Sequence, residues 1–211
     1  MARFGLLLLC LALLLPITGA SAQGQYVAFV FECGDSPAAA LELEKQLQSR
    51  GARITLLLSG TEEVGTEQMG ELGLLCLPGW NGLTRLQVAQ QLKQLRQSLP
   101  EKAKVRWLSP QGEYSDAVRQ VAGAMGYSFL GPSKRASVEP GAASLANQIR
   151  SGDVIYMGKL NPATVALAVE MMDILESRGF QAVTVSELAC RQRIHLTPGS
   201  YYNTFRRRQP A

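Results

Sequence analysis

The chain has 211 residues, with 21 lysines and arginines against 17 aspartates and glutamates, and a formal net charge of +4. This mild surplus does not predict nucleic-acid binding. The length suits one domain with a full hydrophobic core.

The first 22 residues have the pattern of a signal peptide. Arg3 precedes an apolar run at 6–15, which is too short to span a membrane, and Pro16 follows. Ala20-Ser21-Ala22 is a small-residue cleavage site. We therefore expect cleavage near Ala22 and a secreted or cell-surface product without a stable membrane anchor.

Strands and helices then alternate along the chain. Leu41, Leu43 and Leu47, with polar residues between them, predict a helix that ends at Gly51, where glycine suits a C-cap. The pattern next predicts strands at 54–58, 105–108, 127–130, 153–157 and 182–185, and helices at 83–100, 115–125, 140–149 and 164–177. Such alternation is typical of a parallel α/β sheet or barrel in one domain.

The first strand ends in a group of chemically distinctive residues. The apolar run at 26–31 stops at Glu32-Cys33-Gly34-Asp35. Sites in α/β proteins lie where parallel strands end, so this stretch predicts one wall of a site.

The stretch 26–37 resembles the first motif, T-F-D-D-G-P, of the polysaccharide deacetylases (the NodB-homology domain of carbohydrate esterase family 4). The resemblance continues along the chain at 51–60, 71–73, 108–116, 157–165 and 196–202. It implies a distorted (β/α)7 barrel over 23–195, followed by a C-terminal tail at 196–211 with a basic end at 206–208. It also implies that the strand ends bring together Glu32, Cys76, Pro110 and Met157.

The same resemblance implies a degenerate site. The family holds a divalent metal with one aspartate and two histidines, and these positions align with Cys33, Cys76 and Trp80. A second register places Leu75 and Gly79 at the two histidine positions. The family's catalytic base aligns with Glu32 and its general acid with Gly158. The single histidine of the chain, His195, lies beyond the last predicted strand.

We therefore expect a catalytically inactive protein of carbohydrate metabolism that holds no metal and binds a bacterial cell-wall glycan or a protein partner. Trp80 and Trp107 are candidate glycan contacts, although burial in the core is the competing interpretation. The alternative function is an active hydrolase of carbon–nitrogen, non-peptide bonds, which deacetylates N-acetylated sugars with zinc held by Cys33, Cys76 and Glu32.

The resemblance also implies a disulfide between Cys33 and Cys76 in place of the metal. Cys190 would then remain as the odd cysteine, packed as a small apolar residue. Three unbridged thiols are the alternative.

Overall fold

The computed structural model describes residues 24–60, 69–76, 78–97, 99, 103–137, 139 and 141–206. The predicted signal peptide lies outside these ranges, as do Pro100, Pro140 and the basic end at 207–208. Within the described residues, no helix has both the length and the apolar character needed to cross a membrane.

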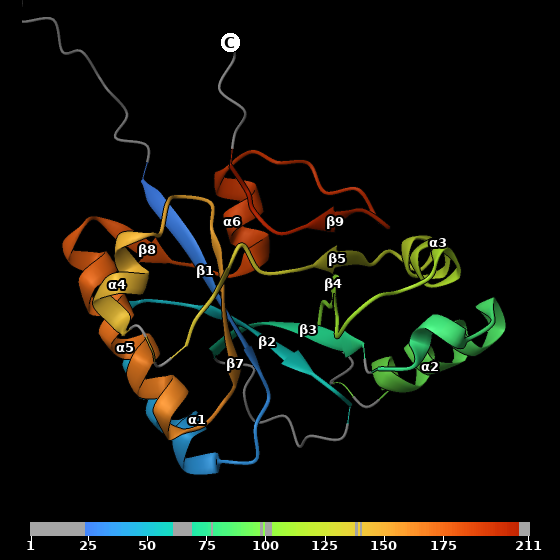
Figure 1. Ribbon diagram of the computed structural model, residues 1–211, viewed down its shortest axis with the longest axis horizontal. Coiled ribbons are helices and arrows are strands. Elements are labelled where there is room, and N and C mark those ends of the chain that lie inside the picture. The colour runs from blue at the N-terminus through green and yellow to red at the C-terminus, as the bar shows by residue number, and fades with distance from the viewer. Residues whose placement is uncertain are drawn as a thin grey trace, which may run out of the picture.

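The predicted alternation of strands and helices is confirmed (Figure 1). The strands are β1 (Gln25–Glu32), β2 (Ile54–Leu58), β3 (Gly70–Cys76), β4 (Trp107–Pro110), β5 (Ser128–Leu130), β6 (Lys134–Arg135), β7 (Val154–Lys159), β8 (Phe180–Ala182) and β9 (Tyr201–Tyr202). The helices are α1 (Pro37–Arg50), the 3-10 turn η2 (Trp80–Gly82), α2 (Arg85–Gln97), α3 (Asp116–Ala124), α4 (Ala142–Asn147), α5 (Pro162–Ser177) and α6 (Val185–Arg191).

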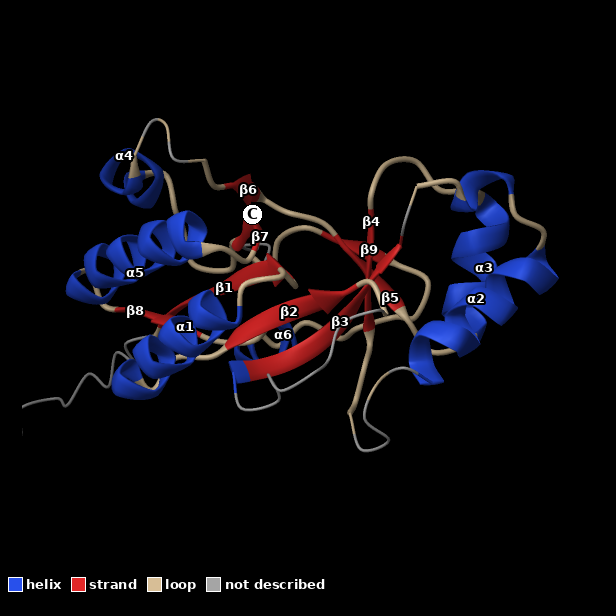
Figure 2. Ribbon diagram, turned by 90° about the horizontal axis from the view of Figure 1, so that it is seen from below, coloured by secondary structure: helices blue, strands red, loops and turns tan. Residues whose placement is uncertain are grey.

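The strands form one parallel sheet that curls into an open barrel. Their order is β6-β7-β1-β2-β3-β4-β5-β9, and β8 pairs with the start of β1. Figure 2 shows α1, α4 and α5 at one end of the curled sheet and α2 and α3 at the opposite end. This is the predicted α/β architecture of a distorted barrel.

The two faces of the sheet belong to different hydrophobic clusters. In β1, Phe29 and Phe31 belong to the cluster that includes the buried side chains of α1, α2, α3 and α5. The alternate residues Ala28 and Val30 pack on the inner face with α6 and Phe205. Since successive side chains of a strand point to opposite faces, Glu32 belongs to the inner face and Cys33 to the helix-covered face.

The last predicted strand, 182–185, is wrong at its C-terminal end. The strand β8 stops at Ala182, and α6 begins at Val185. Thr184 accepts a hydrogen bond from the Glu187 amide, and the Glu187 carboxylate accepts one from the Thr184 amide. This capping box starts a helix where β-branched residues had indicated a strand.

Residues 201–205 belong to the barrel rather than to a tail. Tyr201 and Tyr202 form β9, which pairs in parallel with Phe129 and Leu130 of β5. Phe205 is fully buried in the inner cluster. The predicted boundary at 195 therefore does not separate this segment from the sheet.

The start of α6 is held on the sheet by Glu71 of β3. The carboxylate of Glu71 accepts hydrogen bonds from the Ser186 amide at 3.0 Å, the Ser186 hydroxyl, the Trp107 indole at 3.1 Å and the Thr55 hydroxyl at 3.3 Å. The Thr55 hydroxyl in turn accepts from the Val185 amide at 3.0 Å. Amide groups at a helix N-terminus lack intrahelical acceptors, and these side chains supply them.

Candidate functional site: a cleft where the strands end

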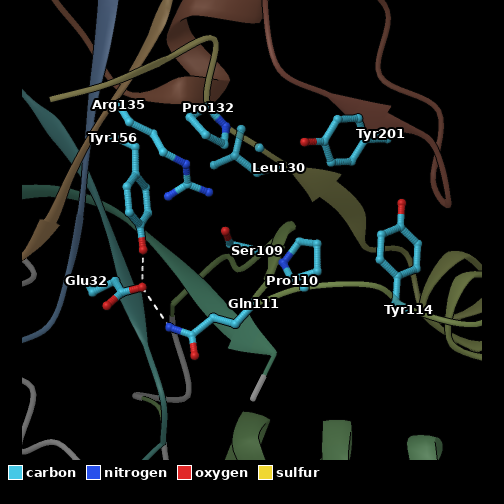
Figure 3. Close-up of a pocket in the computed structure, with 12 residues that line it drawn as sticks. Glu32, Ser109, Pro110, Gln111, Tyr114, Leu130, Pro132, Arg135, Tyr156 and Tyr201 are labelled. Atoms are coloured by element: carbon cyan, nitrogen blue, oxygen red, sulfur yellow. Dashed lines mark hydrogen bonds between the residues drawn. The ribbon is translucent and has the colours of Figure 1, made fainter. Parts of the chain in front are cut away.

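A cleft of about 730 Å³ opens at the carboxyl ends of the strands (Figure 3). Its volume lies within the ~300–1,000 Å³ usual for small-molecule sites. The residues that line it come from β1, the β4 end and following loop, the β5 end, β6, β7 and β9: Glu32, Ser109, Pro110, Gln111, Gly112, Tyr114, Leu130, Gly131, Pro132, Arg135, Tyr156 and Tyr201.

Glu32 is held in this cleft by two donors. The hydroxyl of Tyr156 and the side-chain amide of Gln111 both donate to its Oε1, the latter at 2.8 Å (Figure 3). The backbone amide of Gln111 is itself bonded to the Cys76 carbonyl at 3.1 Å, so the loop that carries Gln111 is fastened to β3. The predicted base position therefore exists as a positioned carboxylate.

Tyr156 reaches Glu32 beside an irregularity in β7. Val30 pairs with Tyr156, but the next residue of β1, Phe31, pairs with Gly158, so β7 carries one extra residue as a β-bulge. Gly158 has a φ of 78°, a conformation that glycine adopts without strain. The position aligned with the family's general acid thus belongs to the bulge and carries no side chain that transfers a proton.

Tyr156 is a donor rather than an acid at neutral pH. Burial raises its pKa most, and the bond to the Glu32 carboxylate raises it further, whereas the nearby Arg135 lowers it. The guanidinium of Arg135 lies 4.9 Å from the centroid of the Tyr156 ring. The phenol therefore keeps its proton and holds Glu32.

Two more tyrosines stand on the opposite side of the cleft (Figure 3). The ring of Tyr114 stacks on Phe129, with a centroid separation of 4.3 Å and an interplanar angle of 7°. Tyr201 is half exposed, and its hydroxyl lies over Gly131, where an added Cβ would come within 1.7 Å of it. Gly131 thus provides the space that Tyr201 occupies.

The residues aligned with the family's metal ligands do not converge on Glu32. Cys76 and Trp80 belong to the helix-side cluster, against which Cys33 packs, whereas Leu75 is the residue at the β3 end that faces inward. Within the described ranges, no three side chains of histidine, cysteine, aspartate or glutamate are grouped to hold a metal ion. The donor set therefore does not fit a zinc site built from Cys33, Cys76 and Glu32.

The predicted disulfide between Cys33 and Cys76 is wrong in this structure, where the two cysteines are not bridged. The strand β2 lies between β1 and β3. Strands are about 4.8 Å apart, so the two Cα atoms are separated by at least about 9 Å, beyond the ~6.8 Å limit for a disulfide. Burial raises the pKa of the Cys76 thiol to about 12. Cys190 is exposed rather than packed as predicted.

Neither tryptophan presents a ring to a ligand. Trp80 is 7% exposed and Trp107 is fully buried. The Trp107 ring contacts Tyr202 and Phe205 edge-on, with centroids 6.0 and 5.9 Å away. Both tryptophans are core residues, as the competing interpretation held, and they give no support to glycan stacking. His195 is exposed.

The sequence reasoning identified Glu32 and the Pro110–Gly112 loop but missed Gln111, Arg135, Tyr156 and Tyr201. Gln111 lies within the stretch 108–116, where the sequence resembles the family. Tyr156 lies two residues after the inward-facing Val154 in the same strand, so the alternation of side chains could have predicted that Tyr156 also faces inward. The two-residue strands that carry Arg135 and Tyr201 show no periodicity to read.

Neither a protein-family model nor the sequence of a curated protein matches the chain. Solved structures do match its fold. The Xyl-CE4 domain of a multidomain xylanase from the hindgut metagenome of Trinervitermes trinervoides superposes with a TM-score of 0.70 at 15% identity, covering 86% of this chain and 98% of that one.

A family 4 acetyl xylan esterase from Clostridium thermocellum, in complex with a cobalt ion, gives a TM-score of 0.71 at 18% identity, covering 85% of this chain and 98% of the esterase. A pseudoenzyme of the same family from Bacillus anthracis gives 0.68 at 15% identity, covering 85% of this chain and 70% of the pseudoenzyme. The chain therefore has the fold of the carbohydrate esterase family 4 deacetylases.

Proposed function

We propose that the protein is an exported, non-catalytic member of this fold that binds a glycan in the tyrosine-lined cleft. The observation that supports the proposal most is the composition of the cleft. It lies at the strand ends, where α/β folds bind ligands, and its described lining residues offer a single carboxylate with an amide, phenols and a guanidinium rather than a group of three metal-binding side chains.

The cleft chemistry suits a hydroxyl-rich ligand. Tyrosine offers a flat apolar ring and a polar tip, which matches the alternation of C–H faces and hydroxyls on a sugar. Glu32 and Gln111 add an acceptor and a donor, already held in place by mutual hydrogen bonding. The structurally similar proteins named above include a xylanase domain and an acetyl xylan esterase, which act on carbohydrates.

Inactivity is part of the proposal because deacetylation by this family's chemistry depends on a bound divalent metal. The carboxylate of Glu32 accepts two hydrogen bonds, and in the described parts of the chain it belongs to no group of three histidine, cysteine, aspartate or glutamate side chains that could hold a metal ion. A pseudoenzyme among the similar structures shows that this fold persists without activity in at least one other protein.

The proposed location is the bacterial cell surface or the medium, after removal of residues 1–22. It is supported by the signal-peptide pattern alone. Expression of the full chain in a bacterium, followed by N-terminal sequencing of the exported product, tests it. A product that begins at Met1 in the cytoplasm would contradict export.

Binding is tested by isothermal titration of the purified protein with chitotetraose, a neutral tetramer of N-acetylglucosamine. We expect saturable binding that weakens several-fold in Gln111→Leu and Tyr156→Phe. The matched control is Tyr26→Phe, since Tyr26 also carries a stacked arginine but lies outside the cleft. Absence of binding to chitotetraose and to the acidic tetrasaccharide described below would refute the proposal.

Activity is tested by acetate release from the same tetramer and from peptidoglycan, with zinc, cobalt or manganese added. No release is expected. Metal-dependent release that is lost in Glu32→Gln would contradict the assignment as non-catalytic.

A further inference from the structure

Among the described residues that line the cleft, Arg135 is the one cation. Its guanidinium points into the cleft beside Tyr156 (Figure 3). Arg135 is exposed, and none of the ion pairs recorded among the described residues includes it. The charge of Arg135 is therefore available to a ligand.

The position of Arg135 is set by the sheet. Arg135 in β6 is the direct partner of Tyr156 in β7, and its guanidinium lies 4.9 Å from the centroid of that ring. Stacking on an aromatic face favours the charged planar group and limits its motion. A planar guanidinium held in this way offers a fork of donors that matches a carboxylate.

The carboxylate of Glu32, which lines the cleft, restricts where an acidic ligand group can lie. Glu32 is bonded to the hydroxyl tip of Tyr156, whereas Arg135 lies against the ring of the same residue. A ligand carboxylate is repelled at the Glu32 end and attracted at the Arg135 end. A neutral sugar at the same place would cover the guanidinium without compensating its lost hydration.

We propose, on the basis of the proposed glycan binding, that the cleft prefers an acidic glycan and that Arg135 binds the carboxylate of a uronic acid or another acidic sugar. Tyr114 and Tyr201, on the opposite side, contact the neighbouring sugar. Arg135 is thus a specificity residue of the cleft.

The preference is tested by calorimetry with three tetrasaccharides. One alternates N-acetylglucosamine with glucuronic acid, the second is its methyl ester, and the third is chitotetraose. The ester removes the charge of the carboxylate and adds one methyl group to it. An exposed ion pair contributes up to about 1 kcal/mol, so we expect the acid to bind about fivefold more tightly than the ester at low salt. Added salt should narrow this difference.

The variant Arg135→Gln should lose the fivefold preference and bind the acid and its methyl ester with equal affinity. Arg135→Lys keeps the charge without the planar fork and should retain part of the preference. The matched control is Arg191→Gln, because Arg191 lies 5.0 Å from the Tyr26 ring centroid, outside the cleft, and its loss should leave the preference unchanged.

If chitotetraose and the ester bind as well as the acid, the inference about Arg135 is wrong while the proposed glycan binding stands. If the preference exists but survives Arg135→Gln, the assignment to Arg135 is wrong. If none of the three binds, both the inference and the proposed function are refuted.

Discussion

Replacement of Glu71 by leucine should destabilise the protein by about 2 to 4 kcal/mol, because its carboxylate accepts from four donors that the leucine cannot serve. The donors are not equal. The Trp107 indole also lies 3.1 Å from the Ser186 hydroxyl oxygen and keeps that acceptor. The Ser186 amide is fixed by the helix and would be left without a hydrogen-bond acceptor, at a cost of about 1 to 3 kcal/mol.

The rest of the loss comes from two hydroxyl groups and from the removal of a carboxylate at a helix N-terminus, a contribution of about 0.3 to 1 kcal/mol. The assay is urea unfolding followed by tryptophan fluorescence. With a denaturant slope of about 2 kcal/mol per molar, the midpoint should fall by about 1 to 2 M.

The matched control is Glu42→Leu, because Glu42 is exposed on α1 and accepts a hydrogen bond from Gln46 of the same helix, at 2.7 Å. Exposed substitutions of this kind change stability by no more than about 0.5 kcal/mol. Equal midpoints for Glu71→Leu and Glu42→Leu would refute the reasoning that Glu71 fastens α6 to the sheet.

Native alkylation at pH 8 should modify the exposed Cys190 first and the buried Cys76 last. Burial raises the pKa of the Cys76 thiol to about 12, and the thiolate is the reactive form. Early labelling of Cys76 would contradict its burial in the core. Burial also raises the pKa of Glu71 above 4.5, so above that pH the folded chain keeps a proton that the unfolded chain has released. The free energy of unfolding, measured relative to Glu71→Gln, should therefore fall as the pH rises from 4.5 through the raised pKa, and a rise would show the opposite shift. Gly131→Ala should push the Tyr201 hydroxyl away and weaken glycan binding several-fold. The unfolding midpoint should barely change, because Tyr201 is half exposed. Unchanged binding would show that Tyr201 does not contact the glycan.

Much of the fold could be predicted because its elements carry local signals. Gly51, in a left-handed conformation with φ 61°, ends α1 as predicted, and Ser115 caps α3 at the predicted boundary. The β3 strand was missed as an element because Gly70 and Gly73 interrupt its apolar pattern. Gly70 is required there, since an added Cβ would lie 2.1 Å from the Ile54 carbonyl oxygen.

The site was harder to predict because a motif alignment places residues along the chain but not on a face of the sheet. Cys33 follows Glu32 directly, yet strand alternation turns its side chain to the helices, and the same rule separates Cys76 from Leu75. Alternation could have excluded a shared metal or disulfide for Cys33, Cys76 and Glu32. The bulge in β7 could not have been inferred, because it depends on the register against β1.

The pairing of β9 with β5 sets the order in which the barrel can be built during synthesis. Tyr201 and Tyr202 pair with residues more than seventy positions earlier, and Phe205 fills the inner face beside Trp107. Contacts of such long sequence separation form late, because the intervening chain must first be brought together. A chain in which residues 201–205 are not yet in place therefore lacks one wall of the cleft and exposes the edge of β5, so ligand binding should begin only after these residues have joined the sheet.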